Sequence, residues 1–263
     1  MRINKFISER GICSRREADK WIEAGRVTVN GAVATLGTQV GEDDEIRVDG
    51  QPVGRRRKSV YLMLNKPVGI ECTTNRSVAG NIVDFVGFPE RIFPIGRLDK
   101  DSDGLILLTN DGDIVNAILR AENAHEKEYI VTVDRPVTDL FIESMSSGVR
   151  ILGRMTNPCR VSRVAKNVFR IVLTQGMNRQ IRRMCSALGY NVRRLQRVRI
   201  MNLKLGTLEP GRWRHLTATE LKSLLSRLEQ SGGSAGSGGS RNTGGAGKLL
   251  GGLSGTRAPK RRR

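Results

Sequence analysis

Three acidic residues alternate along one short segment, and their type and spacing suit a site that does chemistry. They are Asp99, Asp101 and Asp103. A proline precedes the segment and the apolar residues 105–108 follow it, which predicts a tight loop leading into a buried strand. Arg97 and Lys100 flank Asp99, and their charges favour its ionised form. One interpretation is that a single carboxylate reacts while the others cap the turn.

The same spacing fits the first half of a calcium-binding loop, in which alternating carboxylates supply oxygen ligands. The second half does not fit, because Asn110 stands where such a loop needs a bidentate glutamate. Pro94 and Gly96 also exclude the entering helix. We therefore expect no metal. The spacing alone leaves open whether one carboxylate reacts or all three are solvated turn residues.

The composition of the 263 residues points to a polyanionic partner. The formal net charge is +19, while 38% of the residues are hydrophobic, enough for a core. Such a charge favours nucleic acid over a membrane surface. No run approaches a membrane span, and the N-terminus lacks the apolar core of a secretory signal. We expect a cytoplasmic protein that does not bind membranes.

The cysteines and histidines do not form a recognisable metal site. The four cysteines are far apart and include no C-x-x-C pair, and the chain has only two histidines. The cysteines are Cys13, Cys72, Cys159 and Cys185. Free thiols are the simplest expectation for a cytosolic chain of this size, so nothing here indicates redox chemistry.

The first 50 residues predict two short helices followed by a small sheet. Ser14 and Glu17 form a capping box for the second helix, and Asn30-Gly31 is a strong hairpin signal. Five cations gather near the helices, and they form either a solvated charged surface or a binding surface. They are Arg10, Arg15, Arg16, Lys20 and Arg26.

This N-terminal segment closely resembles the S-four-like RNA-binding module. The resemblance rests on the order of its elements and on residues 11–18, with the sequence Gly-Ile-Cys-Ser-Arg-Arg-Glu-Ala. Modules of this kind bind the backbone and shape of RNA. The resemblance therefore implies that RNA is the partner of the five cations.

A second domain is expected to begin after the basic linker at residues 51–58. Patterns typical of buried strands occur at residues 60–64, 126–133 and 169–174. Asn178 is the predicted N-cap of a helix that ends at Gly189. On this helix Arg179, Arg182 and Arg183 fall outside the apolar stripe, so they must find water, phosphate or an acid.

The composition changes sharply at Gln230, beyond a last predicted helix with a capping box at Thr217 and Glu220. The remaining segment is rich in Gly and Ser, contains no acidic residue and ends Lys-Arg-Arg-Arg, which is typical of a disordered basic tail. We expect an α+β protein in three parts. They are an RNA-binding module at residues 1–58, a domain with a mixed, mainly antiparallel sheet and flanking helices at 59–229, and the tail at 230–263.

Four motifs occur together in the second domain. They are L-N-K-P-x-G at residues 64–69, G-R-L-D at 96–99, K-x-Y at 127–129 and N-R-Q-I-R-R-M at 178–184. As a set they resemble the pseudouridine synthases of the RsuA and RluF branch, over a match that runs from Arg2 to about Leu228. Residues 81–85, 94–102 and 125–129 look closest to the RluF enzymes, which modify a uridine of 23S ribosomal RNA.

The resemblance implies a role for individual residues. Asp99 would be the essential aspartate, Tyr129 would pack on the target base, and Arg182 would pair with Asp99. Five further residues would contact the substrate, namely Lys66, Arg97, Lys127, Arg179 and Arg183. Asp101 and Asp103 would have no catalytic role.

The implied reaction suits these residue types. The bond from the sugar to ring nitrogen 1 of uracil breaks, the base turns within the pocket, and carbon 5 forms the new bond, so no cofactor is expected. The carboxylate would attack the sugar or remove one of its protons, and the sequence leaves both routes open. We expect a monomer that acts on a stem-loop uridine of 23S ribosomal RNA, with transfer RNA as a further substrate left open. The alternative is a non-catalytic RNA-binding ribosome-assembly factor, which would not need Asp99, Tyr129 and Arg182 together.

Overall fold

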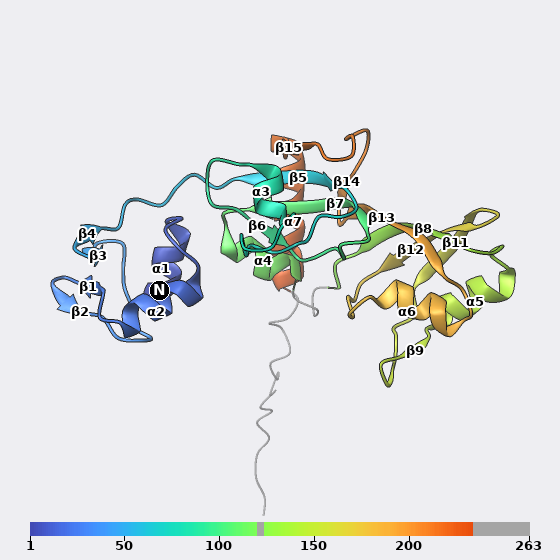
Figure 1. The fold of residues 1–263 in the computed structure, drawn as a ribbon, viewed down its shortest axis with the longest axis horizontal. Coiled ribbons are helices and arrows are strands. Elements are labelled where there is room, and N and C mark those ends of the chain that lie inside the picture. The colour runs from blue at the N-terminus through green and yellow to red at the C-terminus, as the bar shows by residue number, and fades with distance from the viewer. Residues whose placement is uncertain (120–123, 234–263) are drawn as a thin grey trace, which may run out of the picture.

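The computed structural model describes residues 1–119 and 124–233. The predicted tail lies outside the described residues from position 234 onward. A small N-terminal module is joined by an extended linker to a larger domain built on one long sheet (Figure 1). The predicted α+β organisation is confirmed. Within the described ranges, none of the helices combines the length and the apolar character needed to cross a membrane.

The N-terminal module packs two helices on a four-stranded sheet of order β2-β1-β3-β4. Its elements are α1 (Ile3–Glu9), α2 (Arg15–Glu23), β1 (Val27–Val29), β2 (Ala32–Val33), β3 (Ile46–Val48) and β4 (Gln51–Pro52). The capping box is present, because Ser14 Oγ accepts from the Glu17 amide at 3.1 Å. Asn30 and Gly31 both have positive φ, 50° and 85°, as the tight hairpin turn requires. The local signals of this module therefore predicted its elements correctly.

The larger domain is built on a nine-stranded sheet with the path β11-β12-β8-β13-β7-β5-β15. Strand β14 pairs with β13, and β6 pairs with β7. Only the pairing of β13 with β7 is parallel among the described strands, so the sheet is mixed and mainly antiparallel as predicted. The strands are β5 (Tyr61–Lys66), β6 (Phe93–Ile95), β7 (Asp103–Thr109), β8 (Lys127–Val133), β11 (Arg160–Ala165), β12 (Val168–Leu173), β13 (Val192–Ile200), β14 (Leu203–Lys204) and β15 (Trp213–His215).

Helices cover the sheet in two halves. In the half that contains β8, β12 and β13, α5 (Asp139–Ser147) and α6 (Gln180–Ala187) pack on one face, beside the hairpin of β9 (Arg150–Ile151) and β10 (Arg154–Met155). In the other half, α3 (Ile82–Val86) packs on that same face, while α4 (Gly112–Leu119) and α7 (Ala218–Gly233) pack on the opposite one (Figure 1). The face that carries α3 and α6 also carries Tyr129, so the candidate site belongs to this face.

One helix boundary differs from the prediction. Helix α6 begins at Gln180, and Arg179 precedes it in the left-handed conformation with φ 49° and no side-chain cap. Asn178 is therefore not the N-cap. Its carbonyl and side-chain oxygens instead accept hydrogen bonds from Arg183 at 3.0 and 3.2 Å.

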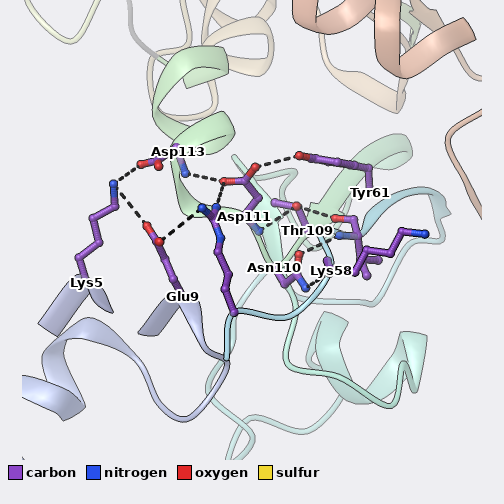
Figure 2. Close-up of polar contacts among 10 residues, drawn as sticks. Lys5, Glu9, Lys58, Tyr61, Thr109, Asn110, Asp111 and Asp113 are labelled. Atoms are coloured by element: carbon purple, nitrogen blue, oxygen red, sulfur yellow. Dashed lines mark hydrogen bonds and ion pairs between the residues drawn. The ribbon is translucent and has the colours of Figure 1, made fainter. Parts of the chain in front are cut away.

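A cluster of charged groups lies between the N-terminal module and the larger domain (Figure 2). Lys5 Nζ of α1 lies 2.7 Å from Asp113 Oδ1 and 3.3 Å from Glu9 Oε1. Arg56 of the linker lies 3.8 Å from both Glu9 and Asp111. The Glu9 side chain is nearly buried in this cluster, whereas Asp113 and Arg56 are largely exposed. These ion pairs orient the module against the start of α4.

Candidate active site

The segment that carries the acidic residues is a loop between β6 and β7, closed by backbone hydrogen bonds. The Ser102 amide donates to the Asp99 carbonyl at 3.1 Å, and the Gly69 amide donates to the Lys100 carbonyl at 2.8 Å. Leu98 is buried beneath the loop, whereas the Asp99 side chain keeps 31% of its surface exposed. The loop therefore presents Asp99 at the surface of the sheet face on which Tyr129 lies.

Two arginines from the start of α6 hold this loop. Arg179 donates to both carboxylate oxygens of Asp101 at 3.1 and 3.0 Å, and it lies 3.6 Å from Asp99 Oδ2. The hydrogen bonds from Arg179 lower the pKa of Asp101, with the charge of Arg182 adding to the effect. Arg179 is therefore the cation that reaches both Asp99 and Asp101.

Arg182 does not form the predicted ion pair with Asp99. Its Nη2 donates to the Asp101 carbonyl at 2.8 Å and to Ser102 Oγ at 3.1 Å, and its Nε lies 3.5 Å from the Asp101 carboxylate. The guanidinium of Arg182 is instead occupied by the carbonyl and carboxylate of Asp101 and by the hydroxyl of Ser102, which lie within its reach. Arg182 therefore fixes the shape of the loop through Asp101 and Ser102. The prediction that Asp101 has no catalytic role did not include this anchor.

Tyr129 lies on β8 and is half-buried against the apolar clusters of both halves of the sheet. Lys127, two residues earlier on the same face, is half-buried, and its Nζ donates to the His125 carbonyl at 3.0 Å. Burial lowers the pKa of Lys127, and the charge of Arg197 lowers it further. The K-x-Y motif thus places an aromatic ring and an amine side by side on one strand.

Lys66 contradicts the prediction that it contacts substrate, because its side chain is fully buried. Its Nζ donates to the carbonyls of Pro67 and Ile70 at 2.8 and 2.9 Å, and burial lowers its pKa. These bonds shape the turn that supplies the Gly69 amide to the loop between β6 and β7. The role of Lys66 is therefore to support the loop.

Of the remaining residues predicted to contact substrate, Arg97 is exposed beside Asp99. Arg183 is exposed as well, and its guanidinium bonds to Asn178.

Two further loop contacts escaped the sequence analysis. Asp103 pairs with Arg194 of β13 at 2.8 Å, and the buried Arg197 bonds to the loop from the same strand. Both arginines lie outside the motifs, and their distance in sequence from the loop left no local signal.

The five cations of the N-terminal module do not share one environment. Arg15, Arg16 and Lys20 are exposed. Arg26 is exposed but pairs with Asp49 at 2.8 Å. Arg10 contradicts its assignment to the RNA-binding surface, because it is buried.

Arg10 belongs to the interior of the module. Its guanidinium stacks 3.1 Å from the centre of the Phe6 ring and donates to the Phe6 carbonyl and to Glu42. Cation–aromatic stacking of this kind stabilises a fold rather than leaving a charge free for phosphate. Arg15, Arg16 and Lys20 are the cations of this set that remain available to RNA.

Within the described part of the chain, no three His, Cys, Asp or Glu side chains come together in a group suited to a metal ion. Arginines accompany all three loop carboxylates, Asp99, Asp101 and Asp103. The electrostatics of the loop are therefore those of carboxylates compensated by guanidinium groups.

Comparisons with known proteins agree with this arrangement. The sequence model of the family described as RNA pseudouridylate synthase matches residues 60–187, and that of the S4 domain matches residues 1–46. The dual-specificity RNA pseudouridine synthase RluF of an Escherichia coli strain is 56% identical over 237 residues, which cover 89% of this chain and 82% of the relative.

Two more distant proteins extend the comparison. The ribosomal large subunit pseudouridine synthase B of Bacillus subtilis is 35% identical over 232 residues, covering 85% of this chain and 95% of the relative. A crystal structure of a pseudouridylate synthase superimposes with a TM-score of 0.64 at 31% identity, covering 85% of this chain and 99% of that one. The similarity therefore spans both the module and the larger domain.

Proposed function

Because this chain belongs to the RNA pseudouridine synthases of the RsuA and RluF branch, and is thus an isomerase, we propose that Asp99 is the group on which its reaction depends. The observation that carries the proposal is the placement of Asp99. It sits in an anchored loop, partly exposed, with Arg179 at 3.6 Å and on the sheet face of Tyr129.

An ionised carboxylate is what the isomerisation needs. In one route it attacks the sugar carbon as the bond to uracil N1 breaks, and in the other it removes a sugar proton. The guanidinium of Arg179, 3.6 Å from Asp99 Oδ2, places a positive charge beside this carboxylate. Either route thus depends on the negative charge of Asp99.

Tyr129 would hold the detached base. A flat, half-buried ring on the sheet offers a stacking surface for uracil, and aromatic stacking tolerates the rotation that brings carbon 5 to the sugar. The uridine must first leave its helix, which costs a few kcal/mol and is easier in a loop than in a duplex. The exposed cations Arg97 and Arg183 are suited to hold the flanking phosphates.

We propose ribosomal RNA as the substrate class, with a stem-loop uridine of 23S RNA as the main target and transfer RNA as a second one. The support is the 56% identity to a relative whose name describes it as dual-specificity, together with the S4 domain. Which uridine is modified would follow from mapping pseudouridine in a strain that lacks the gene.

The decisive test is release of tritium from carbon 5 of uridine in 23S RNA fragments and in transfer RNA. The wild-type enzyme should release it from both, and Asp99→Asn should release none while binding RNA with unchanged affinity. Turnover by pure Asp99→Asn enzyme would refute the role of Asp99. Release from 23S fragments alone would refute the second substrate.

A further inference from the structure

Arg197 is a buried arginine directly beneath the catalytic loop. It is 3% exposed and lies on β13, where its Cα pairs with Tyr129 of β8 and with Gly104 of β7. Directly paired residues of neighbouring strands project to the same face of a sheet. The side chain of Arg197 therefore lies on the face of Tyr129, between the sheet and the loop that carries Asp99.

The guanidinium of Arg197 joins the two ends of that loop. Its Nε donates to the Leu105 carbonyl at 2.7 Å, and its Nη1 donates to the Arg97 carbonyl at 3.4 Å. Gly104 permits this approach, because a Cβ at that position would lie 2.3 Å from the Arg197 carbonyl oxygen. At Gly104 the strands β7 and β13 therefore lie as close together as the backbone allows.

The charge of Arg197 is not matched by an acid. Among the described residues, no carboxylate forms an ion pair with it, and its Nη2 is buried without a hydrogen-bond partner. An arginine in a protein does not lose its proton, so this position keeps a positive charge out of water. The same charge helps to lower the pKa of the neighbouring Lys127.

Arg199, two residues further along β13, provides the contrast. Its side chain is also mostly buried, but it pairs with Glu126 at 3.0 Å and with Glu128 at 2.7 Å. Glu128 and Tyr129 are neighbours on β8, so their side chains project to opposite faces of the sheet. On one face of the sheet, two glutamates thus neutralise the charge of Arg199. On the other face, Arg197 lies beneath the Asp99 loop without an ion pair to a described carboxylate.

We propose that Arg197 is a positioning residue for the reaction, with a second, electrostatic effect on the departing base. It holds the loop ends that place Asp99, and its uncompensated charge stabilises the negative charge that develops on uracil. When the bond from the sugar to N1 breaks, its electron pair stays with the base. Carbon 5 then bonds to the sugar through an electron pair of the ring and loses its proton to solvent, while N1 takes up a proton, so the isomerised base is neutral. This inference rests on the proposed function.

The test compares Arg197→Met and Arg197→Lys with Arg199→Met as the matched control on the opposite face. Single-turnover conversion at saturating enzyme, read by chromatography of nuclease digests, separates the reaction from RNA binding. We expect Arg197→Met to react at least about a hundredfold more slowly, Arg197→Lys about tenfold and Arg199→Met less than about threefold, with similar RNA affinities.

A second readout separates charge from scaffolding. RNA with 5-fluorouridine at the target carries a base whose anion is more stable, so it needs less help in leaving. Loss of the charge in Arg197→Met should therefore slow the fluorinated substrate about tenfold less than it slows uridine. Arg197→Lys keeps the charge and should slow both substrates equally. Should the methionine variant fail to fold, Arg197→Gln, which also lacks the charge, decides the electrostatic effect.

Three results would overturn the proposal. One is an equal slowing of both substrates by Arg197→Met, another is no rescue by Arg197→Lys, and the third is a control as slow as the Arg197 variants. Asp99→Asn is measured in parallel. Its activity would refute the proposed function and leave the Arg197 comparison with wild type readable, so the two failures are distinguishable.

Discussion

The cations of the N-terminal module and those around the Asp99 loop differ in what they contact. Arg15 and Arg16 are exposed to solvent, whereas Arg179, Arg182 and Arg197 are bound to carboxylates and carbonyls of one loop. Phosphate attraction depends on the number of charges and weakens with salt, while positioning depends on tenths of an ångström. We therefore expect the same residue type to supply RNA affinity in one region and loop geometry in the other.

The largest effect should come from the carboxylate that the second region positions. Asp99→Asn keeps the size of the side chain and removes its charge, so turnover should fall below detection, a loss of at least about a thousandfold or about 4 kcal/mol of transition-state stabilisation. The measurement is tritium release at saturating RNA. Asp101→Asn is the control, because it weakens the anchor while Asp99 stays charged, and it should remain active. Equal losses in both variants would show that the loop acts only as a scaffold.

The anchoring arginines should come next. Arg179→Ala removes the cation that reaches both Asp99 and Asp101, and Arg182→Ala removes the bonds to the Asp101 carbonyl and Ser102. We expect each to slow the single-turnover rate about a hundredfold, or about 3 kcal/mol. Arg183, on the same helix, bonds only to Asn178 among the described residues, so Arg183→Ala should cost less than about tenfold. Three equal, small losses would place these arginines with the phosphate-binding cations of the module.

The exposed cations of the module should change affinity without changing the reaction. Replacing Arg15, Arg16 and Lys20 by Gln in the full chain should lower the slope of log affinity against log salt by about 0.7 to 0.9 for each phosphate that the variant no longer binds. The single-turnover rate at saturation should stay within about twofold of wild type. Arg26→Gln is the control, because Arg26 already pairs with Asp49 and should alter the slope less. An unchanged slope in the triple variant would refute RNA binding by this surface.

Excess chelator should leave the rate of tritium release unchanged. The carboxylates of the Asp99 loop are accompanied by guanidinium groups rather than gathered into a site of the kind that binds divalent ions. Tritium release should be the same with and without chelator when the RNA is folded identically in both samples. A loss that one specific metal restores would mean that a cation, not an arginine, compensates Asp99.

Local sequence determined the elements of this protein. Ser14 with Glu17 and Thr217 with Glu220 form the helix starts that their spacing predicts, and Asn30-Gly31 forms the hairpin turn. These signals act over a few residues, so a single segment contains all the groups involved. Apolar runs likewise marked β5, β8 and β12 of the larger domain, whereas β11, β13 and β15 were not predicted.

Tertiary structure decided the partners of the charged groups. Sequence placed Lys66 and Arg10 among the binding residues, yet one is buried under a turn and the other is stacked on Phe6. Arg182 was matched with the wrong carboxylate, and Arg197 attracted no notice. An arginine is long and flexible, and acceptors two residues apart in a loop are equally plausible from sequence. Which one it reaches depends on how α6 and β13 pack beside a loop some 80 to 100 residues away in the chain.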